Sequence, residues 1–145
     1  MSSLRAAHFF RIQRKMIKMK TITTLTAVLA VLTAGNIAYA GGDAEKGAKV
    51  FKKCKACHKI GEGAKNSLGP VLTGVVGRPI ASYEGYNYSS GMKTFAEGGA
   101  VWEEANLATF LADPKGTVPK TKMTYKGLKK ETDIADVIAY LASVQ

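Results

Sequence analysis

The sequence is poor in residues that bind metals or form disulfides. Its 145 residues include two cysteines and two histidines, and one of the histidines, His8, lies in a basic N-terminal segment. Beyond residue 40, the ligands of these types are Cys54, Cys57 and His58. A structural zinc site needs four ligands, and adjacent residues such as Cys57 and His58 bind one tetrahedral ion poorly. With no second cysteine pair, the sequence argues against a zinc site.

Signals for β-structure are also scarce. Residues 61–99 are rich in Gly, Ser, Tyr and Pro and show no sustained alternation of apolar and polar side chains. A redox-active Cys-x-x-Cys pair usually lies beside a strand-to-helix turn in a βαβ unit. No such strand precedes Cys54, and a disulfide to Cys57 would close only a tiny loop. A redox dithiol is therefore disfavoured as well.

Negative charge is absent from the first 40 residues. Six basic residues fall within residues 1–20, and an uncharged run that ends in the small-x-small sequence AYA occupies residues 21–40. This order is typical of a secretory signal. We predict a signal peptide over residues 1–40, cleaved after Ala40, and a periplasmic location. Because the run is close to the ~20 residues that span a bilayer, an uncleaved anchor that tethers the same domain is the alternative.

Residues 41–145 would form the mature protein, a single domain of 105 residues. The whole chain has 21 basic and 11 acidic residues. Removal of the six basic residues of the signal leaves 15, so the net charge falls from +10 to +4. This modest charge does not predict nucleic-acid binding. It fits a soluble protein, expected to be a monomer, whose partners are acidic.

Three segments of this domain have helical periodicity. The first begins near Asp43, which can cap it, and reaches Cys54. The second covers residues 103–112 and stops before Pro114. The third extends from about Thr132 to Val144. Their expected apolar faces comprise Gly47, Val50, Phe51, Leu107, Phe110, Leu111, Ile134, Val137, Ile138 and Leu141.

Two long loop regions, residues 61–99 and 113–130, separate these helices. Loops of this length in a small domain usually serve a function. About 100 residues bury only a modest core. We therefore expect a large apolar group to lie within the loops and to act as their core.

The sequence "KKCKACHKIG" supplies a way to hold such a group. Cys-x-x-Cys-His is the attachment motif of c-type haem. Two cysteines three positions apart can both reach the haem vinyl groups as thioethers, and the next residue can place its imidazole on the iron. The motif predicts one haem c attached through Cys54 and Cys57, with His58 as an iron ligand.

The second axial position of the iron can be assigned by elimination. After residue 40 the chain has no other histidine and only two methionines, Met92 and Met123. Met123 lies in the Pro- and Gly-bounded loop "PKTKMTYKG", between lysines, where it has little reason to be a core residue. We predict Met123 as the ligand and Met92 as a packing residue. His/Met ligation fills both axial sites and raises the reduction potential, which favours electron transfer over catalysis.

These motifs together resemble the class I cytochromes c, in the branch shared by mitochondrial cytochrome c and short bacterial cytochromes. The matching segments are "GDAEKGAKVFKKCKACH", "LGPVLTGVVGR", "GYNYSSGMK" and "VPKTKMTYKGLKKETDIADVIAYL", together with the single Trp102. The resemblance covers residues 41–145. It implies an all-α, small single-haem fold in which three to five helices and long loops surround the covalent haem.

The resemblance also implies roles for individual residues. The carbonyl of Pro70 is expected to accept a hydrogen bond from the imidazole of His58. Around an inner haem propionate, Arg78, Tyr88 and Trp102 are expected to donate hydrogen bonds, with Thr121 supporting the same haem edge. The apolar lining is expected from Leu72, Leu107, Leu111 and Leu141. Gly47 and Phe51 are expected to cross the last helix near Tyr140.

Two positions depart from the family pattern. Phe110 stands where many relatives have a tyrosine, and Met92 stands where they often have an asparagine. Both changes remove a polar group beside the haem. We hypothesise a drier pocket with a shifted reduction potential.

The resulting functional hypothesis is a periplasmic electron carrier without enzymatic activity. The expected partners are redox proteins with acidic docking surfaces, such as a quinol–cytochrome c oxidoreductase, a terminal oxidase, a photosynthetic reaction centre or a dehydrogenase. Lysines flank the haem-ligand segments and would steer such partners. The alternatives are a haem subunit of a periplasmic dehydrogenase and a haem protein that reacts with peroxide or binds gases.

Overall fold

A computed structural model describes residues 41–145 of the chain. The proposed signal or anchor segment, residues 1–40, lies outside the described residues. The described part contains five helices, from α2 to α6, and its only β-pairing is the isolated bridge between Pro79 and Val101. Among these helices none has the length and apolar character needed to cross a bilayer. The all-α expectation is confirmed.

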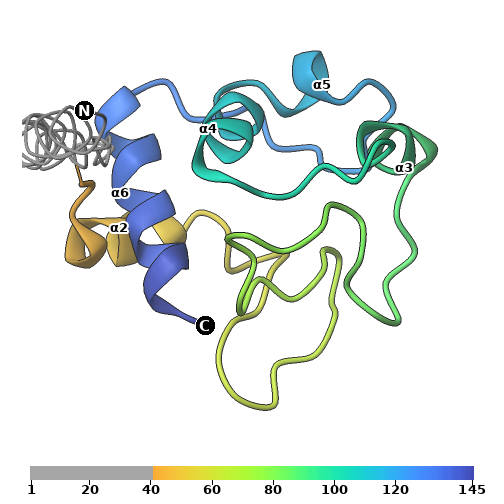
Figure 1. Cartoon of the computed structure of the whole chain (residues 1–145). Coiled ribbons are helices and arrows are strands. Elements are labelled where there is room, and N and C mark those ends of the chain that lie inside the picture. The colour runs from red at the N-terminus through yellow and green to blue at the C-terminus, as the bar shows by residue number, and fades with distance from the viewer. Residues whose placement is uncertain (1–40) are drawn as a thin grey trace, which may run out of the picture. The chain divides into compact units, whose positions relative to one another are not determined.

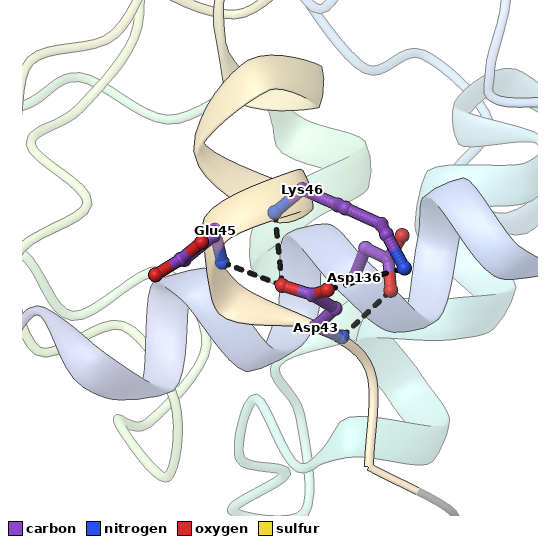
Figure 2. Close-up of polar contacts among 4 residues, drawn as sticks. All are labelled: Asp43, Glu45, Lys46 and Asp136. Atoms are coloured by element: carbon purple, nitrogen blue, oxygen red, sulfur yellow. Dashed lines mark hydrogen bonds and ion pairs between the residues drawn. The ribbon is translucent and has the colours of Figure 1, made fainter.

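The first described helix, α2 (Ala44–Phe51), begins where the sequence predicted. The carboxylate of Asp43 accepts hydrogen bonds from the backbone N–H groups of Glu45 (2.9 Å) and Lys46 (3.1 Å), which otherwise have no partner in the first turn. Figure 2 shows this cap together with the hydrogen bond from the Asp43 N–H to the Asp136 carboxylate, 2.7 Å long. The cap of α2 is thus also a point of attachment to α6.

The last helix, α6 (Glu131–Ser143), packs against α2 in the most extensive helix–helix contact of the domain (Figure 1). It buries the predicted stripe of Ile134, Val137, Ile138 and Leu141. A Cβ atom on Gly47 would collide with the Asp136 carbonyl of α6, so glycine permits the close approach. The ring of Phe51 packs on that of Tyr140, with centroids 5.4 Å apart. The expected helix crossing is present.

The helix α4 (Glu104–Ala112) comes between these two helices in the sequence; it buries Leu107, Phe110 and Leu111 and also contacts α6. Its end coincides with Asp113, which precedes Pro114. Trp102 lies just before the helix. Its ring packs on that of Phe110 (centroids 5.1 Å apart) and on that of Phe95 (6.0 Å). These aromatic contacts join α4 to the loop region before it.

Two short helices occur where we expected loops. The helix α3 (Ser90–Phe95) is capped by the Ser89 hydroxyl, which accepts a hydrogen bond from the Met92 N–H, and α5 (Pro114–Thr117) is capped by Asp113. A further difference concerns Cys54, which lies in the turns after α2 rather than within the helix. In Figure 1 the yellow and green segment between α2 and α3 runs in long loops.

Candidate functional site

A cleft between the loops and the helices brings together the residues that the sequence predicts to bind or line the haem. Its outer part has a volume of about 350 Å³, and its inner part has a volume of about 90 Å³. Five residues line both parts: Cys54, His58, Pro70, Tyr88 and Met123. Cys57 and Thr121 line the outer part, whereas Leu72, Arg78, Trp102 and Leu111 line the inner part.

Cys54 and Cys57 follow α2 in a series of turns. The N–H groups of Cys57 and His58 both donate to the Cys54 carbonyl, at 3.0 and 2.9 Å. Both thiols are free and half-buried, and burial raises the pKa of the Cys54 thiol. This turn places two sulfur atoms and one imidazole on the wall of one cleft. Within residues 41–145 no group of three His, Cys, Asp or Glu side chains converges as a metal site would require.

His58 is fixed by a hydrogen bond between its Nδ1 atom and the Pro70 carbonyl oxygen, 2.8 Å long. A carbonyl oxygen can only accept, so Nδ1 carries the proton and Nε2 keeps its lone pair for another ligand. Burial lowers the pKa of the imidazole, and the bond to Pro70 offsets part of that shift. The ring is therefore held in the neutral tautomer that binds a metal through Nε2.

Gly69 supports the same ring, a role that our sequence analysis missed. It is buried, and a Cβ atom there would collide with the His58 imidazole. Its N–H donates to the Cys57 carbonyl at 2.8 Å. The one signal in the sequence was that Gly69 directly precedes Pro70 within a matched motif. Its contact with the His58 ring depends on how two separate segments pack, which the sequence does not show.

Met123 lies on the loop between α5 and α6, half-buried and packed against the apolar core. Its N–H donates to the Thr121 hydroxyl at 3.2 Å. The preceding residue, Lys122, donates from its side chain to the Asn87 carbonyl at 2.7 Å and so joins this loop to the segment before α3. Met92 is buried at 8% exposure and lines only the inner part of the cleft. Met123, like His58, lines both parts.

The polar groups of the inner part are held by backbone contacts. Arg78 donates from its two terminal nitrogens to the carbonyls of Thr73 and Val71, both at 3.0 Å, and its guanidinium stacks on the Tyr83 ring at 4.8 Å. Two of its five N–H groups are thereby used. Its backbone pairs with that of Trp102 through a 2.8 Å hydrogen bond. Arg78 thus enters the cleft wall beside Trp102 with donors to spare.

Burial also shifts the pKa values of Arg78 and Tyr88 in this inner part. It lowers the pKa of the Arg78 guanidinium and raises the pKa of the Tyr88 phenol, because each charged form loses hydration. Both shifts mean that a charge on either side chain is unfavourable in this cleft unless an opposite charge lies nearby. An anionic group placed between these two side chains would restore the stability of the charged arginine.

The rest of the inner part is apolar. Leu72, Leu107, Leu111 and Leu141 line it, as expected, and Phe110 and Met92 add further apolar surface. Val75 and Val137 also line it, and our sequence analysis had not named them for this role. No buried side-chain nitrogen or oxygen within residues 41–145 lacks a hydrogen-bond partner.

The cleft fits a flat, mostly apolar macrocycle with carboxylate substituents. Its inner surface is apolar, Arg78 and Tyr88 offer polar contacts, and two thiols stand at the wall. Histidine and methionine are one of the known axial pairs for haem iron. The donor set and the lining therefore match a haem.

Comparison with known proteins agrees with this geometry. Residues 44–145 match the family model described as "Cytochrome c". Cytochrome c-554 of Methylosinus trichosporium is 50% identical over 127 residues, which cover 86% of this chain and 93% of that protein. Cytochrome c2 of Rhodomicrobium vannielii is 48% identical over 119 residues, with coverage of 82% and 93%. The solved structure of cytochrome cH from Methylobacterium extorquens is 43% identical, has a TM-score of 0.64, and is matched over 70% of this chain and 99% of its own.

Proposed function

The chain belongs to the bacterial class I cytochromes c, and on this premise we propose that it carries single electrons between redox proteins of the periplasm. Its cofactor is one haem c, bound covalently through Cys54 and Cys57. The bound haem supplies an iron that accepts and releases one electron. The observation that supports the carrier role best is the convergence of Cys54, His58 and Met123 on one cleft.

We assign His58 and Met123 as the axial ligands. The Pro70 carbonyl orients the imidazole and keeps its proton on Nδ1, so that Nε2 remains free to bind iron. The Thr121 hydroxyl accepts from the Met123 backbone and orders the loop that carries the thioether. Two protein ligands held in place would limit rearrangement when the charge of the iron changes. With both bound, no position would remain open for peroxide or a gas.

Substitution of each methionine by alanine tests this assignment. Met123→Ala should abolish the weak long-wavelength charge-transfer band of the methionine–iron bond and lower the midpoint potential. Met92→Ala is the matched control, because it removes the other methionine of the domain and should keep the band. Loss of the band in Met92→Ala with retention in Met123→Ala would reverse the assignment.

For the inner part of the cleft we propose that Arg78, Tyr88 and Trp102 bind a haem propionate. Arg78 has three N–H groups beyond those given to the Thr73 and Val71 carbonyls. A carboxylate buried in an apolar cleft is stable only when it is paired and hydrogen-bonded. Arg78 would supply the opposite charge, and all three side chains can donate hydrogen bonds. Leu72 and Leu111 would exclude water from the macrocycle.

Acidic redox proteins are the partners that the surface charge favours. Lys53 and Lys122 line the cleft, and further lysines flank the ligand segments. Exposed charges of one sign accelerate association with the opposite sign and are screened by salt. The oxidation rate of the reduced protein by a purified bacterial cytochrome c oxidase should therefore fall as ionic strength rises. A rate that is independent of salt, or that rises with it, would contradict electrostatic steering.

Residues 1–40 are proposed to direct export and to be removed after Ala40. The basic start, the uncharged run and the AYA ending support this proposal. Intact-mass measurement of the haem protein from a periplasmic extract should give a chain that starts at Gly41. A membrane-bound protein that retains residues 1–40 would instead establish the anchor.

A further inference from the structure

Leu68 is the one large apolar side chain within residues 41–145 that is strongly exposed, at 78%. A single exposed leucine is not unusual in itself. Its position is what separates it from an ordinary surface residue. Leu68 lines the outer part of the cleft together with Cys57 and His58, and so stands at the mouth of the proposed haem site.

The backbone around Leu68 is held from three sides. Its carbonyl accepts a hydrogen bond from the Tyr86 hydroxyl at 2.8 Å. The next residue, Gly69, donates to the Cys57 carbonyl at 2.8 Å and abuts the His58 ring. Before it, Asn66 donates to the Glu84 carbonyl at 3.1 Å and accepts from the Val71 N–H at 3.1 Å. The exposure of Leu68 is therefore a property of a well-supported turn.

The surroundings of Leu68 are basic. Lys53 and Lys122 line the same part of the cleft, and Lys65 is exposed three positions earlier in the chain. Each cleft lysine has one partner, because Lys53 forms an ion pair with Asp133 (3.3 Å) and Lys122 donates to the Asn87 carbonyl. An apolar side chain on a rigid turn within a charged border has the composition of a binding hot spot, whose centre is apolar and whose rim is polar.

We propose that Leu68 is the apolar contact that seats the electron-transfer partner over the cleft mouth. The partner that fits is a redox protein whose docking surface has a small apolar pocket bordered by acidic side chains. This inference rests on the proposed carrier function. In this arrangement the lysines govern the approach of the partner, whereas Leu68 governs how long the complex lasts.

The two kinds of contact differ in their response to salt, and this difference gives the test. The probe is a purified bacterial cytochrome c oxidase, with turnover measured against the concentration of reduced wild-type, Leu68→Asn, Leu68→Met and Lys65→Gln proteins at low and high ionic strength. Leu68→Asn should raise the apparent Kd about tenfold, the effect of losing roughly 1.4 kcal/mol, and by the same factor at both salt concentrations. Lys65→Gln should weaken binding only at low salt.

Leu68→Met controls for the substitution itself, because it keeps an apolar side chain of similar volume and should bind as the wild type does. Thermal unfolding and the midpoint potential of each variant report whether the cleft is intact. Equal Kd values for the wild type and Leu68→Asn at both salt concentrations would overturn the inference and leave the carrier function standing. A wild-type protein that the oxidase does not oxidise would overturn the carrier role towards this partner class, and the Leu68 contact with it.

Discussion

At the scale of single residues, Lys120 is the clearest case of local strain near the proposed iron ligands. Its φ angle is 64°, in the left-handed region that favours glycine, and it lies three residues before Met123. Lys120→Gly should raise the free energy of unfolding by about 0.5–1 kcal/mol, because ~1–2 kcal/mol of strain is relieved and part is offset by the greater entropy of glycine in the unfolded chain. Denaturant unfolding of the haem protein measures the change.

The control for this prediction is Lys115→Gly in α5. That residue has helical backbone angles, so glycine there should lower stability by about 0.5–1 kcal/mol. Two lysine-to-glycine changes five residues apart should thus have opposite signs. A loss of stability in both would show that the left-handed geometry of Lys120 carries no strain.

Phe110 and Met92 bear on the polarity of the haem cleft. Both are buried, at 7% and 8% exposure, and both line its inner part. A polar group there stabilises the more charged ferric state, so Phe110→Tyr should lower the midpoint potential; for a one-electron couple, about 59 mV corresponds to a tenfold change in the redox equilibrium. Redox titration measures it. Phe95→Tyr is the control, because Phe95 packs on Trp102 without lining the cleft, and an equal shift in both variants would contradict the drier-pocket hypothesis.

At the scale of the elements, the N-terminus of α2 links stability to pH. Hydrogen bonds and the charge of Lys46 lower the pKa of the Asp43 carboxylate from its usual value of 3.8. The folded protein therefore binds this proton less readily than the unfolded chain, and the carboxylate stabilises the fold above pH 3.8. This contribution is lost as the pH falls through the lower pKa of the folded state.

Asp43→Asn should separate this contribution from the cap itself. Asparagine keeps the oxygen acceptor but has no charge. The wild type should be the more stable protein at neutral pH, and the difference should vanish in the pH range below 3.8. Thermal unfolding from pH 2 to 7 tests this, with Glu45→Gln as a control that removes a charge from the same turn but no hydrogen bond. A difference that is constant with pH would contradict the assignment.

The elements show why some helices were predicted and others were not. The helices α2, α4 and α6 are eight or more residues long and carry apolar periodicity, so their existence follows from the sequence. The helices α3 and α5 span six and four residues, too few for a periodic pattern. Their sequence signals are the caps Ser89 and Asp113 and, for α5, Pro114 at the first helical position, all of which also occur in turns.

At the scale of the whole molecule, the haem completes the core. The apolar side chains of Leu72, Met92, Trp102, Leu107 and Leu111 line the cleft, so the haem would add the apolar contacts that their cleft-facing sides otherwise lack. A Cys54→Ala/Cys57→Ala variant, which cannot attach haem, should have little helical signal in far-UV circular dichroism and no cooperative thermal transition. The haem-containing wild type, purified in the same way, is the reference. Native helicity with cooperative melting in the variant would contradict a cofactor-dependent core.

The site was largely predictable because its chemistry uses scarce residues. One histidine and two cysteines after residue 40 left few choices, and the expected cleft residues do line one cleft. The contact of Gly69 with His58, the bond from Lys122 to Asn87 and the exposure of Leu68 were not predictable. Each depends on how loops distant in sequence pack together, and common residues such as these carry no local signal of that packing.

The pairing of α2 with α6 also has a consequence during protein synthesis. The Asp43 N–H and the Asp136 carboxylate that accepts from it are 93 residues apart, with nearly the whole domain between them. On the ribosome, α2 emerges early and has no partner until α6 has been made. Because distant contacts must close before they stabilise anything, we expect α2 to gain its main packing partner only after α6 has been made. A chain in which α2 still lacks α6 would keep Cys54 and Cys57 accessible to whatever machinery attaches the haem.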